Sequence, residues 1–382
     1  METQQKTEIY SPGLEGVIAC KTRICQIDGQ AGKLYYAGYP IEDLVHHSTF
    51  EEVSFLLWQQ RLPRQDELEQ LDKMFKETRS LPAEVLQFLE LMPHTSHPMD
   101  ALRTVASLLA CFDTNLEKSP EANLQRAIFL TARFPTIVAN FHRLRQNQKP
   151  IQPHPDLGLA ANFLYMLLGK EPTADQARVM DAALILHADH EMNASTFAAL
   201  VTASTLSDIY SAVASGIGAL KGPLHGGANE AVLKMLLEIA DPANVESYVE
   251  QALVKKTKIM GFGHRIYKSY DPRARIFKEY ARRLSGRTKF SRFFKINEKL
   301  EEVMQAKKGQ HGIFPNVDLY SGIVYHQLGI PADLFTPIFA IARVAGWTAH
   351  ILEYWRDNRL FRPNALYEGP PPRPYVPIEQ RR

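Results

Sequence analysis

The sequence KGPLHGGANE, residues 221–230, separates two helical patterns in the chain. Pro223 and the pair Gly226 and Gly227 break helical periodicity, so they predict a tight turn that places His225 directly before a new helix. Free N–H groups and the positive end of the helix dipole disfavour an imidazolium at this place. We therefore expect a neutral His225 that can donate a hydrogen bond to a developing oxyanion. The alternative is a histidine that only caps the helix.

Two later stretches contain further candidate catalytic groups. The sequence GFGHRIYKSYDPR, residues 261–273, places His264 beside glycines, and PNVDLYSG, residues 315–322, places Asp318 at a turn before a helix. A carboxylate with neutral imidazoles can remove a proton next to a carbonyl, because the carboxylate takes the proton and an imidazole stabilises the enolate oxygen. Arginines beside these loops imply a partner with a carboxylate. The chain has no Gly-x-Ser-x-Gly elbow and no cysteine in an activating context, so this set lacks a nucleophile.

The composition is that of an ordinary globular protein. The 382 residues, 45% of them hydrophobic, are enough for two domains or for one large and one small domain. The net charge of +2 requires neither a nucleic-acid nor a membrane partner. Residues 1–8 are polar, which argues against a secretory signal, and no uninterrupted apolar run is long enough to span a bilayer. Cys20, Cys25 and Cys111 have no metal-ligand spacing, so we expect reduced thiols and a cytoplasmic protein.

The secondary structure predicted from periodicity is nearly all α, after a small β-hairpin at residues 23–36. Capping boxes at Thr49 and Thr173 predict the starts of two helices, the second of which ends at His187. Proline after residue 358 predicts an extended C-terminal tail. Further helices are expected at 82–91, 98–112, 121–145 with a kink at Pro135, 156–168, 194–220, 228–239, 244–255, 272–284, 296–306, 317–327 and 335–356. This pattern predicts an all-α fold class.

The sequence HADHE, residues 187–191, allows a metal-site interpretation, because His187, Asp189 and His190 are potential ligands within four residues. No third, distant ligand stands out in the sequence. We therefore expect no bound metal and interpret His187 as a hydrogen-bonded histidine at a helix end.

The three stretches above, together with HADHEMNAST at 187–196 and ARVAGW at 342–347, resemble the citrate synthase family. The resemblance extends over essentially the full length, from LEGV at 14–17 to Arg362. It implies a helical fold in which residues 1–225 and 322–382 form a large domain. Residues 226–321 would form a small domain that closes over the cleft. The length resembles the short bacterial and archaeal branch, which implies a homodimer.

The resemblance also implies a reaction and its residues. Acetyl-CoA would be condensed with oxaloacetate, and citryl-CoA hydrolysed to citrate and CoA, without a cofactor. Asp318 would be the base, His225 would stabilise the enol or enolate, and His264 would hydrogen-bond the keto oxygen. The positions that match the family's oxaloacetate-binding residues are His190, Arg273, Arg343 and Arg362, the last reaching into the neighbouring subunit's site. The candidates for CoA binding are Lys256, Arg265 and Lys268, for which a solvated basic face is the alternative.

Two alternatives to citrate synthesis stay open. One is 2-methylcitrate synthesis from propionyl-CoA, because Leu319 stands where the family usually has an aromatic residue. One methylene group is worth only about 1–3 kcal/mol of discrimination, so the acyl chain is not decided by the sequence. The other is a catalytically silent, helical ligand-binding or scaffold protein. The intact His225, His264 and Asp318 argue against it, since a binding protein needs no base.

Overall fold

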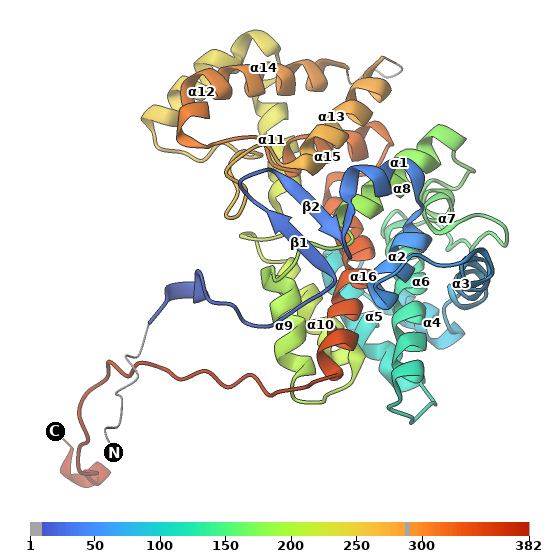
Figure 1. Ribbon diagram of the computed structural model, residues 1–382, viewed down its shortest axis with the longest axis vertical. Coiled ribbons are helices and arrows are strands. Elements are labelled where there is room, and N and C mark those ends of the chain that lie inside the picture. Colours follow the sequence, from blue (N-terminus) through green and yellow to red (C-terminus); the bar gives the residue numbers. More distant parts are fainter. Residues whose placement is uncertain (1–9, 287–290, 382) are drawn as a thin grey trace.

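A small antiparallel sheet precedes the helices in the computed structural model, which describes residues 10–286 and 291–381 (Figure 1). Strands β1 (Cys25–Asp28), β2 (Lys33–Tyr36) and β3 (Tyr39–Pro40) lie in the order β1-β2-β3, with Ile27 opposite Leu34. The Asp28 carboxylate accepts hydrogen bonds from two backbone N–H groups of the β1–β2 turn. The predicted hairpin is confirmed, and β3 adds a third strand to it. The polar stretch 1–8 lies outside the described residues.

Helices form almost all the remaining structure, so the predicted all-α class is confirmed. Besides short 3-10 turns, the helices of the described chain are α1 (Ile41–His47), α2 (Phe50–Gln59), α3 (Gln65–Thr78), α4 (Ala83–Leu91), α5 (Pro98–Leu108), α6 (Pro120–Arg145), α7 (Leu159–Leu168), α8 (Ala174–His187), α9 (Ala194–Ala203), α10 (Ile209–Leu220), α11 (Ala228–Ile239), α12 (Val245–Val254), α13 (Pro272–Ser285), α14 (Ser291–Lys308), α15 (Asp318–Gln327) and α16 (Phe335–Trp355).

The predicted capping box at Thr173 begins α8. The Thr173 hydroxyl accepts from the Gln176 backbone N–H at 3.2 Å, and the Gln176 side chain accepts from the Thr173 N–H at 2.9 Å. At the start of α2 only half of the predicted box forms: Thr49 accepts from the Glu52 N–H at 3.2 Å, but the Glu52 carboxylate accepts from the Ser48 hydroxyl at 2.6 Å. Both helices nevertheless begin where the sequence predicts, and α8 ends at His187.

The prediction of one helix over residues 194–220 is wrong, because a turn divides it into α9 and α10. The Ser204 hydroxyl donates to the Val201 carbonyl at 2.7 Å, and Leu206 has a positive φ of 62°. Asp208 then caps α10 by accepting from the Ser211 N–H at 2.8 Å. The kink expected at Pro135 does not interrupt α6, which is one helix from residue 120 to 145.

Helix α16 forms the centre of the fold (Figure 1) and packs against α2, α6, α8, α9 and α10. The close approach of α10 to α16 depends on Gly216, since a Cβ there would lie 3.1 Å from the ring of Trp347 on α16. Residues 332–355 are the one segment in the described chain with the length and hydropathy of a membrane span. However, 94% of an apolar stretch of 18 residues within it is buried inside the protein. Its apolar character therefore belongs to the core, where Arg343 is also buried.

Helices α11 to α15 gather at one end of the molecule (Figure 1), where α13 packs on α15 and α12 on α14. The small domain predicted at residues 226–321 consists of α11 to the first turn of α15. Because α15 continues to Gln327, the boundary at 321 falls inside a helix. The division into two domains stays a prediction.

Candidate active site

The turn that contains His225 lies between α10 and α11, as predicted. The His225 N–H donates to the Gly222 carbonyl at 2.9 Å, and the Gly226 N–H donates to the Leu220 carbonyl at 3.0 Å. A Cβ on Gly226 would lie 2.4 Å from the Leu220 oxygen, so this position requires glycine. The turn holds His225 three residues before α11 begins.

His225 is neutral and its hydrogen-bonding partners orient the ring. Its Nε2 lies 2.8 Å from the Ser195 hydroxyl and accepts from the Ser195 backbone N–H at 3.3 Å. Because a backbone N–H can only donate, Nε2 is the acceptor and the hydrogen is on Nδ1. Burial, with a smaller effect of the Arg343 charge, lowers the pKa of His225 to about 4. This agrees with the expected neutral imidazole, with burial as the main cause of the low pKa.

Backbone and side-chain hydrogen bonds join the other two stretches, 261–273 and 315–322. The Asn316 N–H donates to the Gly261 carbonyl and the Asn316 amide to the Gly263 carbonyl, both at 2.9 Å. The Asn316 side-chain oxygen accepts from the Asp318 N–H at 3.0 Å. These contacts fix the start of α15, with Asp318, against the loop that contains His264.

His264 is also held as a hydrogen-bond donor. Its Nδ1 accepts from the N–H groups of Ile266 and Tyr267 at 3.1 and 3.2 Å, which leaves the hydrogen on Nε2. Burial, assisted by the Arg273 charge and opposed by Asp271, lowers the pKa of His264 to about 4. His264 is therefore a neutral imidazole whose N–H is on Nε2.

His190 lies beside His264, with their ring centroids 5.2 Å apart. Its Nε2 is 3.3 Å from the Tyr267 hydroxyl. Burial, and next the Arg273 charge, holds the pKa of His190 well below its ordinary value. The structure thus brings His190, from the segment after α8, to the loop before α13.

Arg273 forms a buried ion pair with Asp271, a residue for which the sequence suggested no role. Its Nε and Nη2 donate to the two Asp271 oxygens at 3.0 and 2.8 Å. The same carboxylate accepts from the Val317 N–H at 3.2 Å, so it connects Arg273 to the Asp318 turn. An Asp-Pro pair at a helix start is an N-cap signal that the sequence shows. No local signal indicates that the Asp271 carboxylate also accepts from Val317, 46 residues away.

Arg343 extends from α16 toward the same place. Its Nε donates to the His187 carbonyl at 2.8 Å, and its guanidinium lies 4.6 Å from the Phe339 ring centroid. Its Nη1 and Nη2 are buried and have no hydrogen-bond partner among the described residues. His187 itself ends α8 with Nδ1 2.9 Å from the Ala183 carbonyl, and burial lowers its pKa to about 3. This agrees with its interpretation as a helix-end histidine.

Asp318 is a carboxylate with a markedly raised pKa. Burial raises the pKa of Asp318 to about 6, while the nearby Arg273 charge opposes the shift. A carboxylate that titrates near neutral pH is a better proton acceptor than an ordinary aspartate. Asp318 therefore has the protonation properties of a general base.

Four predicted binding residues are exposed, although the Lys268 charge contributes to the lowered pKa of His264. Arg362 is exposed in the C-terminal segment, where its Nη1 donates to the Pro363 carbonyl at 2.6 Å. Lys256, Arg265 and Lys268 are exposed on the loops around the glycines of residues 261–263. Their placement permits contact with a ligand at the surface but shows none.

Two cavities lie away from this group. One, of about 680 Å³, is lined by residues that include Asp113 and Tyr210, and the other, of about 590 Å³, by residues that include Glu51 and Asp181. Neither is lined by a predicted site residue. Within residues 10–286 and 291–381, no three His, Cys, Asp or Glu side chains are placed to hold a metal ion. The candidate site is thus defined by its histidines, arginines and Asp318.

Comparison with known proteins identifies the family. A family model described as citrate synthase, C-terminal domain, matches residues 13–364. Citrate synthase 2 of Bacillus subtilis (strain 168) is 49% identical over 371 residues, covering 97% of this chain and 98% of that protein. The citrate/2-methylcitrate synthase of the same strain is 43% identical over 368 residues, covering 96% and 98%.

A solved structure agrees with the sequence relatives. It is the citrate synthase of the thermophilic archaeon Thermoplasma acidophilum, in a ternary complex with carboxymethyl coenzyme A and oxaloacetate. The TM-score is 0.94 at 38% identity, and the match covers 98% of this chain and 100% of that one. The chain therefore belongs to the citrate synthase family, enzymes of the citrate (Si)-synthase acyltransferase type.

Proposed function

We propose that this enzyme condenses acetyl-CoA with oxaloacetate and hydrolyses the resulting citryl-CoA to citrate and CoA, with Asp318 as the general base. The single observation that best supports the proposal is the buried Arg343 guanidinium, whose Nη1 and Nη2 have no partner among the described residues. A buried, unpaired charge is costly, and a carboxylate is the partner that fits a guanidinium best. A dicarboxylic substrate such as oxaloacetate supplies it.

Proton removal from the acetyl group is the first step. Asp318 takes a proton from the methyl carbon, and the electron pair of that C–H bond forms the enolate. His225 donates its Nδ1 hydrogen to the thioester oxygen, on which negative charge develops. A neutral imidazole suits this role because the pKa of His225, about 4, leaves it uncharged at pH 7.

Carbon–carbon bond formation follows. The enolate carbon attacks the keto carbon of oxaloacetate, and the keto oxygen takes up one proton, which balances the proton that Asp318 removed, as it becomes the hydroxyl of citryl-CoA. The Nε2–H of His264 would polarise that oxygen, and the two backbone N–H groups that donate to Nδ1 support this role. Water then attacks the thioester carbonyl, the C–S bond breaks, and CoA leaves with citrate as the second product.

Oxaloacetate is assigned to His190, Arg273, Arg343 and Arg362. The first three converge in the structure, since His190 lies beside His264 and its pKa responds to Arg273 and Arg343. The Thermoplasma relative was solved with oxaloacetate and a CoA derivative, which supports the choice of substrates. For CoA we propose Lys256, Arg265 and Lys268, whose ammonium and guanidinium groups suit its phosphates.

A homodimer would complete the site with Arg362 from the second copy. The C-terminal segment leaves α16 and extends away from the helices (Figure 1). It exposes apolar side chains along its length, with Leu366 61%, Tyr367 74% and Tyr375 80% exposed. A second copy of the chain would cover such side chains and receive Arg362. We also propose that the enzyme is cytoplasmic and uses no cofactor.

A second candidate function is 2-methylcitrate synthesis from propionyl-CoA, because one relative has the name citrate/2-methylcitrate synthase. Leu319, the position that departs from the family pattern, is fully buried and packs against Gly261. Leu319 would therefore influence the preference for an acyl chain through the position of the Gly261 loop, and not by direct contact with the acyl group in the cleft.

Release of CoA at constant oxaloacetate tests the proposal, with acetyl-CoA and propionyl-CoA compared by kcat/KM. We expect acetyl-CoA to be preferred by at least tenfold, and omission of oxaloacetate to stop the release. Equal or better use of propionyl-CoA would make 2-methylcitrate the main product. Release from neither substrate would contradict the proposed reaction and favour a catalytically silent protein.

A further inference from the structure

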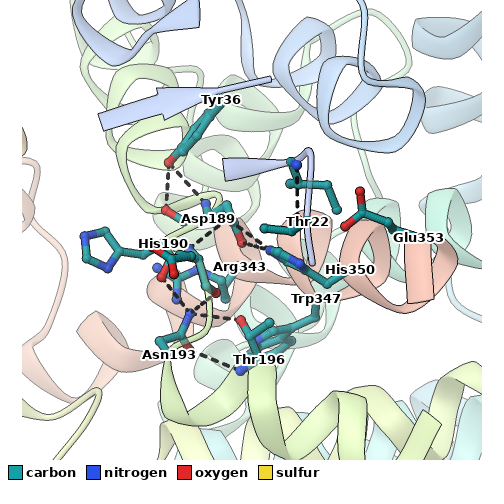
Figure 2. A network of polar contacts seen from close by, with 12 residues as sticks. Thr22, Tyr36, Asp189, His190, Asn193, Thr196, Arg343, Trp347, His350 and Glu353 are labelled. Atoms are coloured by element: carbon teal, nitrogen blue, oxygen red, sulfur yellow. Dashed lines mark hydrogen bonds and ion pairs between the residues drawn. The ribbon is translucent and has the colours of Figure 1, made fainter. Parts of the chain in front are cut away.

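Asp189 and His350 form a buried ion pair beside the candidate oxaloacetate site (Figure 2). His350 Nε2 lies 3.2 Å from each of the two Asp189 oxygens, and the two side chains are 1% and 0% exposed. Asp189 directly precedes His190, while His350 is on α16, seven residues or about two turns after Arg343. The pair thus connects the two elements that hold the proposed substrate-binding side chains.

The surroundings of Asp189 fix it in place (Figure 2). The Tyr36 hydroxyl, from β2, donates to the Asp189 carbonyl at 2.9 Å and lies 3.1 Å from its N–H. The Glu191 N–H donates to the Asp189 carboxylate at 3.0 Å. A Cβ on Gly346 would lie 2.5 Å from Asp189 Oδ1, so α16 meets this carboxylate between the turns of Arg343 and His350.

One carboxylate therefore interacts with two basic side chains, and Asp189 raises the pKa of His350 against the effect of burial. Burial alone would raise the pKa of Asp189, but His350, and to a smaller extent Arg343, hold that pKa below its ordinary value. Asp189 in turn opposes the lowering of the Arg343 pKa by burial. The hydrogen bonds are nevertheless distributed unequally: Asp189 Oδ2 is bonded to His350, while Asp189 Oδ1 and the terminal Arg343 nitrogens have no hydrogen-bond partner in the described structure.

We propose that His350 is a positioning residue that occupies the Asp189 carboxylate and thereby leaves the Arg343 guanidinium free to bind a substrate carboxylate. Without His350, a buried anion would lack its cation, and Arg343 is the cation on the same helix that already interacts with it. Asp189 and the substrate would then compete for Arg343. The proposal rests on the assignment of Arg343 to oxaloacetate under the proposed function.

The test compares His350→Leu with the double variant Asp189→Asn/His350→Leu. We expect His350→Leu to raise KM for oxaloacetate at least tenfold and to change KM for acetyl-CoA less than twofold. The added Asp189→Asn should return KM for oxaloacetate to within threefold of the wild-type value, because an amide does not capture Arg343 as a carboxylate does. If the pair only stabilised the fold, His350→Leu would lower the Tm but leave KM for oxaloacetate within threefold of the wild-type value, and that result would overturn the proposal.

Two further variants make the result decisive. Thr348→Val is the matched control, because Thr348 is a buried residue of α16 that accepts from the Trp58 indole N–H at 2.9 Å. It should lower the Tm and leave both KM values unchanged. Arg343→Gln should raise KM for oxaloacetate. If it does not, the proposed function of Arg343 fails; if it does while His350→Leu has no effect, only the role of His350 fails. If His350→Leu does not fold, the double variant is measured alone, and its KM for oxaloacetate should lie within threefold of the wild-type value.

Discussion

The ring of His225 is bonded to Ser195, a residue 30 positions earlier in the chain. Its Nε2 lies 2.8 Å from the Ser195 hydroxyl, and Trp347 donates its indole N–H to the same hydroxyl at 3.1 Å. Ser195 is therefore the contact through which the first turn of α9 and the central helix α16 orient the proposed oxyanion-stabilising imidazole. This relationship fixes the ring nitrogen that donates and also the direction of its hydrogen.

Replacement of this hydroxyl, in Ser195→Ala, should lower kcat without much effect on oxaloacetate binding. The backbone N–H of Ser195 would still bond Nε2, so the ring would lose part of its orientation only. We expect a roughly tenfold decrease in kcat, equivalent to about 1.4 kcal/mol, with KM for oxaloacetate within twofold of wild type. Steady-state CoA release measures both. Ser54→Ala is the control, since Ser54 is a buried serine that donates to the Phe50 carbonyl away from the site.

Removal of the proposed base, in Asp318→Asn, should abolish most turnover while the enzyme still binds oxaloacetate. General base catalysis contributes about 10²–10⁴-fold to rates, so kcat should fall by about that factor. Calorimetric titration should give an oxaloacetate Kd within threefold of wild type. Asp333→Asn is a matched control, because Asp333 pairs with Arg145 at 2.7 Å outside the site. Turnover within tenfold of wild type would show that another group is the base.

The pH dependence of kcat/KM should report the pKa of Asp318, which is about 6. Below that pH the carboxylate is protonated and cannot accept a proton, so kcat/KM for acetyl-CoA should fall tenfold per pH unit. A flat profile between pH 7 and pH 5 would contradict the assignment.

The stability of the folded enzyme should also depend on the protonation of Asp318. The folded pKa of Asp318 is raised above its ordinary value of 3.8, so the folded enzyme binds this proton more tightly than the unfolded chain does. The resulting stabilisation is present at low pH and is lost as the pH rises through about 6. Asp318→Asn has no charge to bury, and its Tm at pH 8 should therefore exceed that of the wild type.

The two glycines beside His264 allow backbone strain and packing to be separated. Gly261 and Gly263 have φ values of 82° and 80°, but a Cβ on Gly261 would lie 2.9 Å from the Leu319 side chain, whereas a Cβ on Gly263 would have no atom within 4 Å. Gly263→Ala should lower the free energy of unfolding by about 1–2 kcal/mol for the left-handed conformation. Gly261→Ala should cost about 1–3 kcal/mol more for overpacking. Urea unfolding measures both, and equal losses would show that Leu319 can move away.

Local sequence signals were enough to predict most helices and the position of His225. A capping box such as that at Thr173 acts within one turn, and Pro223 with Gly226 restricts only its own turn, so neighbouring residues suffice to recognise them. The division of residues 194–220 was missed because apolar and small residues continue through it. Its turn depends on side-chain bonds of Ser204 and Asp208 that compete with the helix.

The partners that orient the site could not be predicted in this way. Asp271 reaches Val317 across 46 residues, and Asn316 reaches Gly263 across 53. Such pairs form because the helices pack, and nothing in the sequence next to either residue indicates the other. The resemblance to the family suggested Asp318 and His264 as candidates, but the hydrogen bonds that orient His264, and the burial that shifts both pKa values, became visible only in three dimensions.

Arg362 should act in the site of the second copy, which a mixture of two defective variants can test. Arg362→Ala should raise KM for oxaloacetate by at least tenfold, because a substrate carboxylate loses a cationic partner. Co-expression of Arg362→Ala with Asp318→Asn chains gives mixed dimers in which one site combines an intact Asp318 with an intact Arg362 from the partner. With random pairing, about half of the dimers are mixed and one of their two sites is complete, so at an oxaloacetate concentration near the wild-type KM about a quarter of the wild-type rate per site should return.

Each homodimeric variant, purified alone and mixed only in the assay, is the control for activity that does not require shared sites. Co-expression without any recovery would place Arg362 in its own subunit's site or outside the site altogether. The apolar side chains that follow Arg362 favour recovery, because a second copy of the chain would cover them. Recovery would also show that dimerisation is a requirement of this site and not only a means of stabilising the fold.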